Sequence, residues 1–180
     1  EWDAIELPSQ LMENFAWQWD VLYAMSRHRK SKEALPRTLF DRLFAAKNFQ
    51  VGLKIIRQLG FLLFDLRIHS QENRPWMDIY REIQRQLSVL PQADYDRFPH
   101  AFTHIFSGGY AAGYYSYLWA EVLSADAYDL FRRTEDRTKV GQRFWQEVLS
   151  RGGSRPAYQS FVAFVGREPK TEALLEQLGL

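Results

Sequence analysis

The chain has 180 residues, of which 46% are hydrophobic and 16% aromatic, enough for one domain or a large piece of one with a substantial core. Its 23 Lys and Arg balance 22 Asp and Glu, so it lacks the basic excess typical of nucleic-acid or anionic-membrane binding, and we expect neither partner. The absence of cysteine excludes disulfides and thiolate metal sites and fits a reducing, cytoplasmic location.

The sequence predicts an all-α fold, because apolar residues recur at helical spacing and no segment alternates as a strand would. In chain order, helices are expected over residues 1–25, 38–69, 75–90, 111–132, 140–150, 156–165 and 169–178. The second of these is either one rod or two helices with a bend near Gly52 or Gly60. Since no internal repeat or linker divides the chain, residues 1–180 are expected to form a single helical region.

The first predicted helix carries a line of polar side chains. Pro8 stands near its start, where the missing N–H of proline costs nothing. Glu6, Gln10 and Glu13 recur at i, i+4 and i+7, so one face presents two carboxylates and an amide. Such a line is typical of the solvent-exposed face of an amphipathic helix. A carboxylate at the start of a helix is also favoured by the helix dipole.

Residues 98–119 are unusually rich in side chains that can do chemistry. A histidine-bearing segment leads through Gly108-Gly109 into a predicted helix, on which Tyr110, Tyr114 and Tyr117 would lie on one face. A row of phenols can donate hydrogen bonds to a carbonyl oxygen that gains negative charge. The alternative is that these tyrosines are amphipathic core residues that bury the ring and expose the hydroxyl.

His100 and His104 have the i, i+4 spacing of a two-histidine metal clamp on a helix. Pro99 and the glycines that follow make a long helix there doubtful. Ala101 also stands where the H-E-x-x-H motif of zinc peptidases has its catalytic glutamate, and that motif occurs nowhere in the chain. A direct metal role for this pair is therefore disfavoured.

Several stretches, in order along the whole chain, resemble one family. They are EWDAIELPSQLMENF, LFAAKNFQVGLKIIRQLGFLLFDLRIH, HIFSGGYAAGYYSYLWAEVLSADAY, LSRGGS and GREP. The chain is similar to the C-terminal catalytic region of the thimet oligopeptidase and oligopeptidase A family of zinc metallopeptidases, especially its bacterial oligopeptidase A branch. The resemblance implies a multi-helix part of a zincin-type catalytic domain.

The resemblance also implies roles for individual residues. Glu6, which precedes the Pro-Ser-Gln turn, would be the third ligand of one zinc ion, and an H-E-x-x-H segment upstream would supply the other two ligands and the general base. His104 falls on the family's oxyanion-stabilising histidine, and Tyr117 is the phenol expected to polarise the scissile carbonyl. The positions expected to bind the peptide are Gly108, Gly109, Tyr110 and Tyr114.

The expected function is therefore that of the C-terminal part of a zinc-dependent oligopeptidase, which hydrolyses internal bonds of short peptides with a metal-activated water. The chain does not begin with Met, and we expect a piece of a longer protein that binds zinc weakly or not at all and is inactive alone. Apolar surface left uncovered would favour self-association. The alternative is a non-catalytic helical binding module that retains the family scaffold.

Overall fold

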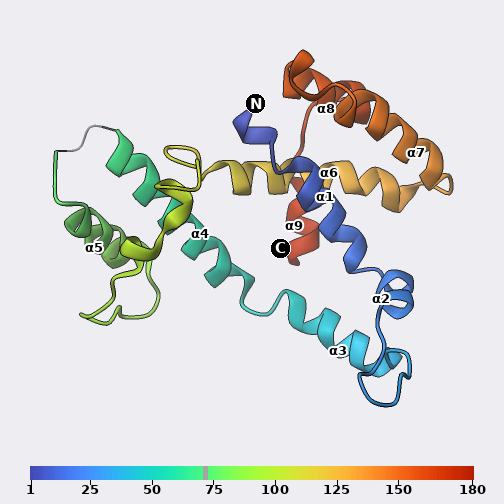
Figure 1. Ribbon diagram of the computed structural model, residues 1–180, viewed down its shortest axis with the longest axis horizontal. Helices are drawn as coiled ribbons and strands as arrows, with labels where there is room; N and C mark the ends of the chain where they lie inside the picture. Colours follow the sequence, from blue (N-terminus) through green and yellow to red (C-terminus); the bar gives the residue numbers. More distant parts are fainter. Residues whose placement is uncertain (71–72) are drawn as a thin grey trace. The chain divides into compact units, whose positions relative to one another are not determined.

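The computed structural model describes residues 1–70 and 73–180, and in these residues it contains helices and turns but no strand (Figure 1). The all-α prediction is confirmed. The α-helices are α1 (Leu7–Ala16), α2 (Trp19–Met25), α3 (Arg37–Lys47), α4 (Val51–His69), α5 (Trp76–Leu87), α6 (Ser116–Arg133), α7 (Arg137–Phe144), α8 (Ala157–Val165) and α9 (Glu172–Leu178). No described helix is long and apolar enough to cross a membrane.

The described residues form two compact units. Unit 1 contains Glu1, residues 3–49 and residues 119–180. Unit 2 contains Trp2 and residues 50–118. The boundary within the first half of the chain falls where α3 gives way to α4, and the second boundary falls inside α6.

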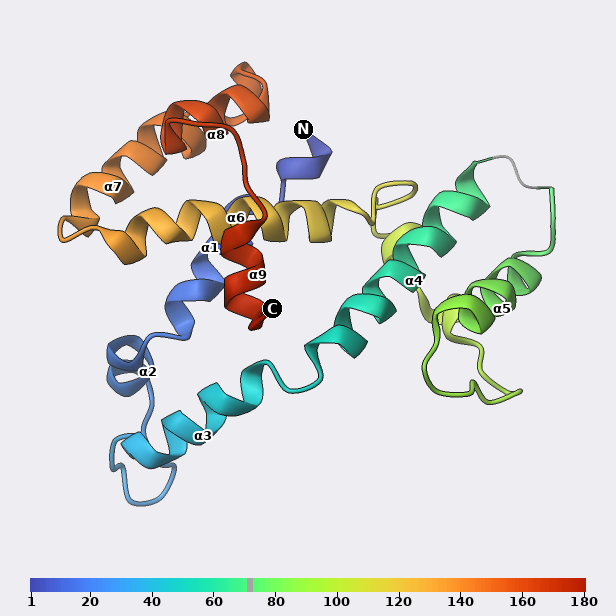
Figure 2. The same ribbon diagram turned by 180° about the vertical axis from the view of Figure 1, so that it is seen from behind.

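Unit 1 is organised around the part of α6 that follows Leu118. One apolar core joins this helix to α1, α7 and α8, and α8 returns along the π turn that extends α7 (Figure 2). The buried members of this core are Leu7, Leu11, Leu123, Ala127, Tyr128, Phe131, Phe144, Phe161 and Phe164. Burying a large apolar side chain stabilises a fold by about 1.5–3 kcal/mol, so this core is the main support of the unit.

A buried carboxylate on α6 ties the last part of the chain to unit 1. Asp126 is 1% exposed and accepts two hydrogen bonds from the Arg167 guanidinium, at 2.7 and 2.6 Å. The Lys170 backbone N–H donates a third, at 2.9 Å. Because all of these donors lie between α8 and α9, Asp126 fixes the path of the chain into its last helix.

Unit 2 is built on the packing of α4 against α5, which lie side by side in both views (Figures 1 and 2). Its core combines this helix pair with the segment that follows α5. The buried members are Phe61, Phe64, Ile79, Tyr80, Ile83, Phe102 and Ile105. Asp65 also lies on α4 and is 0% exposed, and its role is described below.

The structure corrects two of the predicted helices. The segment expected to be one helix over residues 1–25 is interrupted at Gln18, whose extended backbone lets its side chain donate to the Tyr128 hydroxyl at 2.7 Å. The segment 38–69 forms two helices, which was the second of the two arrangements predicted for it. The chain breaks at Asn48–Gln50, where Gln50 is left-handed (φ 53°), while Gly52 and Gly60 both lie inside α4.

Candidate functional site

The aromatic side chains of residues 98–119 gather around one histidine in unit 2. His104, Tyr110, Tyr114 and Tyr117 form what we call the His104 cluster. The imidazole lies 6.2, 5.9 and 6.2 Å from the ring centroids of the three tyrosines in that order. Tyr110 and Tyr117 stack at 4.8 Å, and Tyr114 lies 5.2 Å from Tyr117. An exposed imidazole is therefore bounded by three half-buried phenol rings.

The three tyrosines come together, but not in the way that their spacing predicts. The helix expected from residue 111 begins only at Ser116, and residues 111–115 form a turn. Tyr110 and Tyr114 therefore precede α6, and only Tyr117 lies on it. The turn folds the chain back, so that Tyr110 stacks on Tyr117 instead of lying two helical turns away from it.

Backbone hydrogen bonds close the loop between His104 and the first tyrosine. The Thr103 carbonyl accepts from the N–H groups of Ser107 and Gly108, at 2.9 and 2.8 Å. The His104 carbonyl accepts from Tyr110 N–H at 2.9 Å. Gly109 has a φ of 83°, a conformation that a residue with a side chain rarely adopts. These contacts place the imidazole beside Tyr110.

Gly108 allows the closest backbone approach in this loop, and replacing it should destabilise the protein. A Cβ at residue 108 would lie 2.8 Å from His104 Cα and 2.9 Å from the His104 carbonyl oxygen. Because both atoms belong to the backbone, Gly108→Ala should lower the free energy of unfolding by about 1–3 kcal/mol, measured by urea denaturation.

Gly141→Ala is the matched control for this substitution. Gly141 lies inside α7, and a Cβ there meets nothing within 4 Å. Since alanine is the better helix former, this variant should be stabilised by up to about 1 kcal/mol. Equal stability of the two variants would contradict the tight approach at Gly108.

A buried carboxylate on α4 holds the turn that carries the tyrosines. Asp65 accepts the backbone N–H groups of Ala112 and Tyr114, both at 2.9 Å. Ala112 is left-handed (φ 53°), which costs energy for a residue other than glycine. His69 Nδ1 lies 2.9 Å from Asp65 Oδ1 and 2.8 Å from the Asp65 carbonyl oxygen. His69 thus partners both the carboxylate and the backbone carbonyl of Asp65.

Tyr114 forms the inner wall of the His104 cluster. Its hydroxyl donates to Gln58 Oε1 at 3.2 Å, and its ring meets Phe102 edge-on at 5.0 Å. Burial raises the pKa of the Tyr114 phenol, and the neighbouring Tyr117 adds to the increase. The phenol therefore stays protonated, as a hydrogen-bond donor, well into the alkaline range.

Trp2 is the outer neighbour of the tyrosine turn. Its ring lies 5.0 Å from that of Tyr110. A Cβ at residue 113 would approach the indole to 2.4 Å, so Gly113 leaves the space that Trp2 fills. Neither Trp2 nor Asp65 was singled out in the sequence. Asp65 could have been noticed in the sequence because it is the only acidic residue in the apolar pattern of α4.

His100 and His104 do not lie on one helix. His100 lies in a 3₁₀ turn (Phe98–Ala101), with its ring 4.6 Å from that of Trp76, while His104 lies in the next turn (Thr103–Ile105). Over the described ranges, 1–70 and 73–180, no group of three or more His, Cys, Asp or Glu residues could hold a metal ion. The helical i, i+4 arrangement that a two-histidine clamp would use is therefore not formed by these residues.

Glu6 belongs to unit 1, directly before α1. It is half-buried, and Oε2 accepts the Ser9 hydroxyl at 2.7 Å. The same hydroxyl lies 3.0 Å from the Glu6 carbonyl oxygen. Ser9 thus holds the carboxylate in one orientation, as an outer-shell partner does for a metal ligand.

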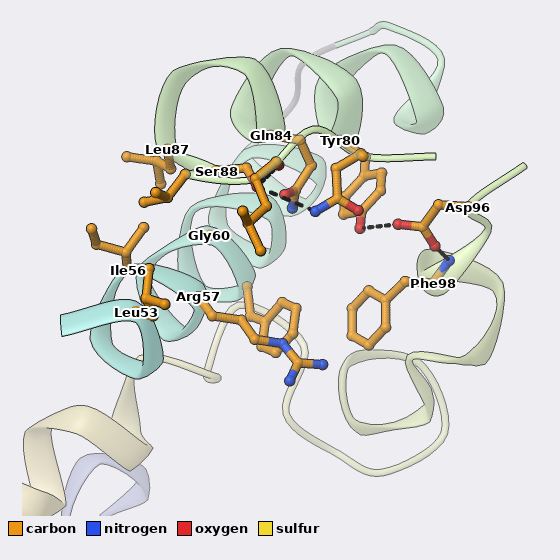
Figure 3. Close-up of a pocket in the computed structure, with 14 residues that line it drawn as sticks. Leu53, Ile56, Arg57, Gly60, Tyr80, Gln84, Leu87, Ser88, Asp96 and Phe98 are labelled. Carbon is orange, nitrogen blue, oxygen red and sulfur yellow. Dashed lines mark hydrogen bonds between the residues drawn. The ribbon is translucent and has the colours of Figure 1, made fainter. Parts of the chain in front are cut away.

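A pocket of about 400 Å³ lies in unit 2 between α4, α5 and the segment that follows α5 (Figure 3). Its walls are mostly apolar, and Figure 3 shows the Arg57 side chain extending across it. Tyr80 donates to Asp96 at 2.9 Å on one side. Phe61 lines the pocket and also meets Tyr114 edge-on, with 6.0 Å between the rings, so it separates this pocket from the His104 cluster.

The Tyr80 phenol should make the protein sensitive to alkaline pH. Burial, and then the hydrogen bond and charge of Asp96, raise the pKa of Tyr80 far above its usual value of about 10. The folded protein therefore keeps a proton that the unfolded chain releases. Its free energy of unfolding should be insensitive to this group below about pH 10 and should fall as the pH rises further.

Tyr80→Phe tests this expectation in urea-unfolding measurements between about pH 8 and 11. The variant should be about 1 kcal/mol less stable at pH 8, because one buried hydrogen bond is lost, and should lose less stability on alkalinisation. Tyr95→Phe, at a tyrosine that is 84% exposed, is the control and should follow the wild type. An unchanged alkaline slope in the Tyr80 variant would contradict the assignment.

Comparison with known proteins shows which class of protein has this helical architecture and contains the tyrosine-lined histidine. The chain matches Peptidase family M3 over residues 1–180. It therefore belongs to this peptidase family, as its resemblance to the thimet oligopeptidase and oligopeptidase A family implied, and it is a helical part of such a peptidase.

Individual relatives agree with this assignment. The chain is 48% identical to oligopeptidase A of Salmonella typhimurium over 184 residues, which cover 99% of this chain and 27% of that protein. It is 43% identical to a probable cytosolic oligopeptidase A of Arabidopsis thaliana, over 100% of this chain and 27% of the relative. Saccharolysin of Saccharomyces cerevisiae is 35% identical over 99% of this chain and 26% of its own length. The chain thus spans about a quarter of these relatives.

Proposed function

We propose that this chain is the C-terminal part of a zinc-dependent oligopeptidase that hydrolyses internal bonds of short peptides. The single observation that carries the proposal is the His104 cluster, an exposed imidazole bounded by three phenols in a member of Peptidase family M3. Imidazole and phenol N–H and O–H groups suit a carbonyl oxygen that gains negative charge during acyl transfer.

Zinc, when bound, would activate the attacking water and polarise the scissile carbonyl. Glu6 has the chemistry of one ligand, and its hydrogen bond from Ser9 orients the carboxylate as outer-shell groups do. Catalytic zinc sites need three protein ligands, so two histidines and a general base must come from an H-E-x-x-H segment outside this chain. On this proposal the chain alone has an incomplete site.

The residues of the His104 cluster would divide the remaining work. His104 and Tyr117 donate hydrogen bonds to the carbonyl oxygen as it becomes an oxyanion, and each such donor is worth about 2.7–4 kcal/mol of barrier. Tyr110 and Tyr114 bind the peptide backbone, and Gly108 and Gly109 let the loop lie close to it.

The proposed partners follow from this division. Short peptides are the substrates, and the polypeptide that carries H-E-x-x-H completes the site in a cytoplasmic enzyme. Produced alone, the chain should self-associate, because large apolar side chains such as Met25 (79% exposed) and Phe49 (76% exposed) are uncovered. A monomer at high concentration in light scattering would contradict that expectation.

The function is tested by assaying an internally quenched short peptide with the full-length protein and with this chain alone. The full-length protein should cleave the peptide, lose activity with a zinc chelator and regain it with added zinc. The chain alone should not cleave. An inactive, correctly folded full-length protein would refute the peptidase function, and zinc-dependent cleavage by the lone chain would refute the division of ligands.

A further inference from the structure

A buried carboxylate helps to hold the turn that carries the tyrosines. Asp65 is 0% exposed, and its two oxygens are used separately. Oδ1 accepts Ala112 N–H, and Oδ2 accepts Tyr114 N–H, both at 2.9 Å. The turn and helix α4 therefore share a pair of charge-assisted hydrogen bonds, which are about twice as strong as neutral ones.

The third neighbour of the carboxylate is His69, one helical turn further along α4. Its Nδ1 lies 2.9 Å from Asp65 Oδ1 and 2.8 Å from the Asp65 carbonyl oxygen. Both neighbours are acceptors, so Nδ1 must carry the proton and donate it. An ionised carboxylate is tolerated in a protein interior only when such donors surround it, and Asp65 has three.

The position of the two accepted N–H groups shows what the carboxylate does. Ala112 is left-handed (φ 53°), which a non-glycine residue adopts only when its surroundings impose it. Asp65 binds the N–H of this residue and the N–H two residues further on. Together with the turn's own hydrogen bond from Gly113 N–H to the Tyr110 carbonyl at 2.8 Å, it stabilises the reversal of the chain against the helical conformation that the local sequence favours.

The reversal of the chain in turn sets the walls of the His104 cluster. Tyr114, whose N–H Asp65 holds, places its ring 5.9 Å from His104 and 5.2 Å from Tyr117. Tyr110, at the start of the turn, stacks on Tyr117 at 4.8 Å. A displacement of the backbone at residues 112–114 would therefore move phenols on two sides of the imidazole.

From this geometry we propose that Asp65 is a positioning residue for peptide hydrolysis, which acts by holding the 110–115 turn so that the phenols surround His104. The inference rests on the proposed peptidase function. Asp65 touches neither substrate nor metal in this proposal and is not a catalytic residue. Its effect passes through the tyrosines of the turn and reaches Tyr117 through the rings of Tyr110 and Tyr114 that pack against it.

The anchoring is tested in the full-length protein by hydrogen–deuterium exchange, with Asp65→Asn as the variant. Asparagine keeps the shape but has one acceptor oxygen, so its amide group must face a backbone N–H that then has no acceptor. Exchange in a peptide spanning residues 110–115 should accelerate at least about tenfold. Unchanged exchange there would overturn the proposal.

Asp126→Asn is the matched control, because Asp126 is equally buried and equally well paired but lies in unit 1. It should lower the melting temperature without accelerating exchange over residues 110–115. If Asp65→Asn does not fold, His69→Ala removes only one donor from the carboxylate and should accelerate exchange of the same peptide by a smaller factor. Equal effects of the His69 and Asp126 variants on residues 110–115 would refute the anchoring.

Kinetics separate a positioning role from a merely structural one. Asp65→Asn should lower kcat about tenfold or more, but only about threefold or less when Tyr117 is already phenylalanine, because the loss passes through that phenol. Losses that multiply would refute the positioning role. If the wild-type full-length protein cleaves no peptide, the proposed function fails and takes the catalytic consequence with it, while the exchange measurements still decide the anchoring.

Discussion

Tyr117→Phe in the full-length protein should lower kcat about 100- to 1,000-fold with little change in KM. Losing one preorganised donor to an oxyanion has a cost of this size. The interaction is expected only in the transition state, so the loss should appear in kcat and in kcat/KM alike. The ring remains, and with it the stacking on Tyr110 at 4.8 Å and the contact with Tyr114 at 5.2 Å. The measurement is steady-state cleavage of a quenched peptide.

Tyr115→Phe is the control for this prediction. Tyr115 lies in the same turn and is also half-buried, but it is not one of the three tyrosines whose rings surround His104. Its kcat should stay within about twofold of wild type, as for a substitution away from the reacting atoms. A Tyr117 variant as active as the Tyr115 variant would remove the main support for the proposed oxyanion role.

The helices that could be predicted from the sequence are those with local signals at both ends. Residues 156–165 were expected to be helical, and α8 is Ala157–Val165. Pro156 precedes it with extended backbone, and Gly166 follows it with a φ of 89°, the left-handed conformation that ends helices. Neither signal depends on the rest of the chain, so the prediction did not need the tertiary structure.

The tyrosine turn could not be predicted, because part of what stabilises it is not local. The spacing of Tyr110, Tyr114 and Tyr117 favours a helix, and no proline interrupts it. The turn closes with a local hydrogen bond from Gly113 N–H to the Tyr110 carbonyl at 2.8 Å, and it is also held by Asp65, 47 and 49 residues away in the sequence from Ala112 and Tyr114. The structure brings the residues of the cluster together by a backbone reversal that the sequence does not predict.

The break between α1 and α2 was missed for the same reason. Nothing near Gln18 in the sequence indicates a stop, and one helix was expected over residues 1–25. In the structure the Gln18 amide donates to the Tyr128 hydroxyl at 2.7 Å, across 110 residues of sequence, and Met25 is 79% exposed. The Gln18 amide oxygen also accepts from the Arg137 guanidinium, at 3.1 Å. Two long-range hydrogen bonds thus offset the local helical preference, which is worth less than about 1 kcal/mol per residue.

Glu6→Gln in the full-length protein should weaken zinc binding by more than the 10- to 100-fold that typically follows loss of an outer-shell partner, and should abolish peptide cleavage at low zinc. Glutamine keeps the shape and the hydrogen-bonding capacity toward Ser9 but removes the negative charge that a zinc ligand supplies. Zinc content after dialysis, measured by atomic absorption, and peptidase activity over a zinc titration are the two readouts.

Two substitutions at neighbouring residues test whether the loss of zinc binding is due to Glu6 acting as a ligand. Glu13→Gln changes an exposed carboxylate on the same helix, two turns further on, and should leave zinc content and activity as in wild type. Ser9→Ala removes the 2.7 Å hydrogen bond to Glu6 and should weaken zinc binding by about 10- to 100-fold, between the other two variants. This ranking of zinc affinities is expected if Glu6 binds the metal and Ser9 orients the Glu6 carboxylate. Full zinc retention by the Glu6 variant would exclude Glu6 as a ligand.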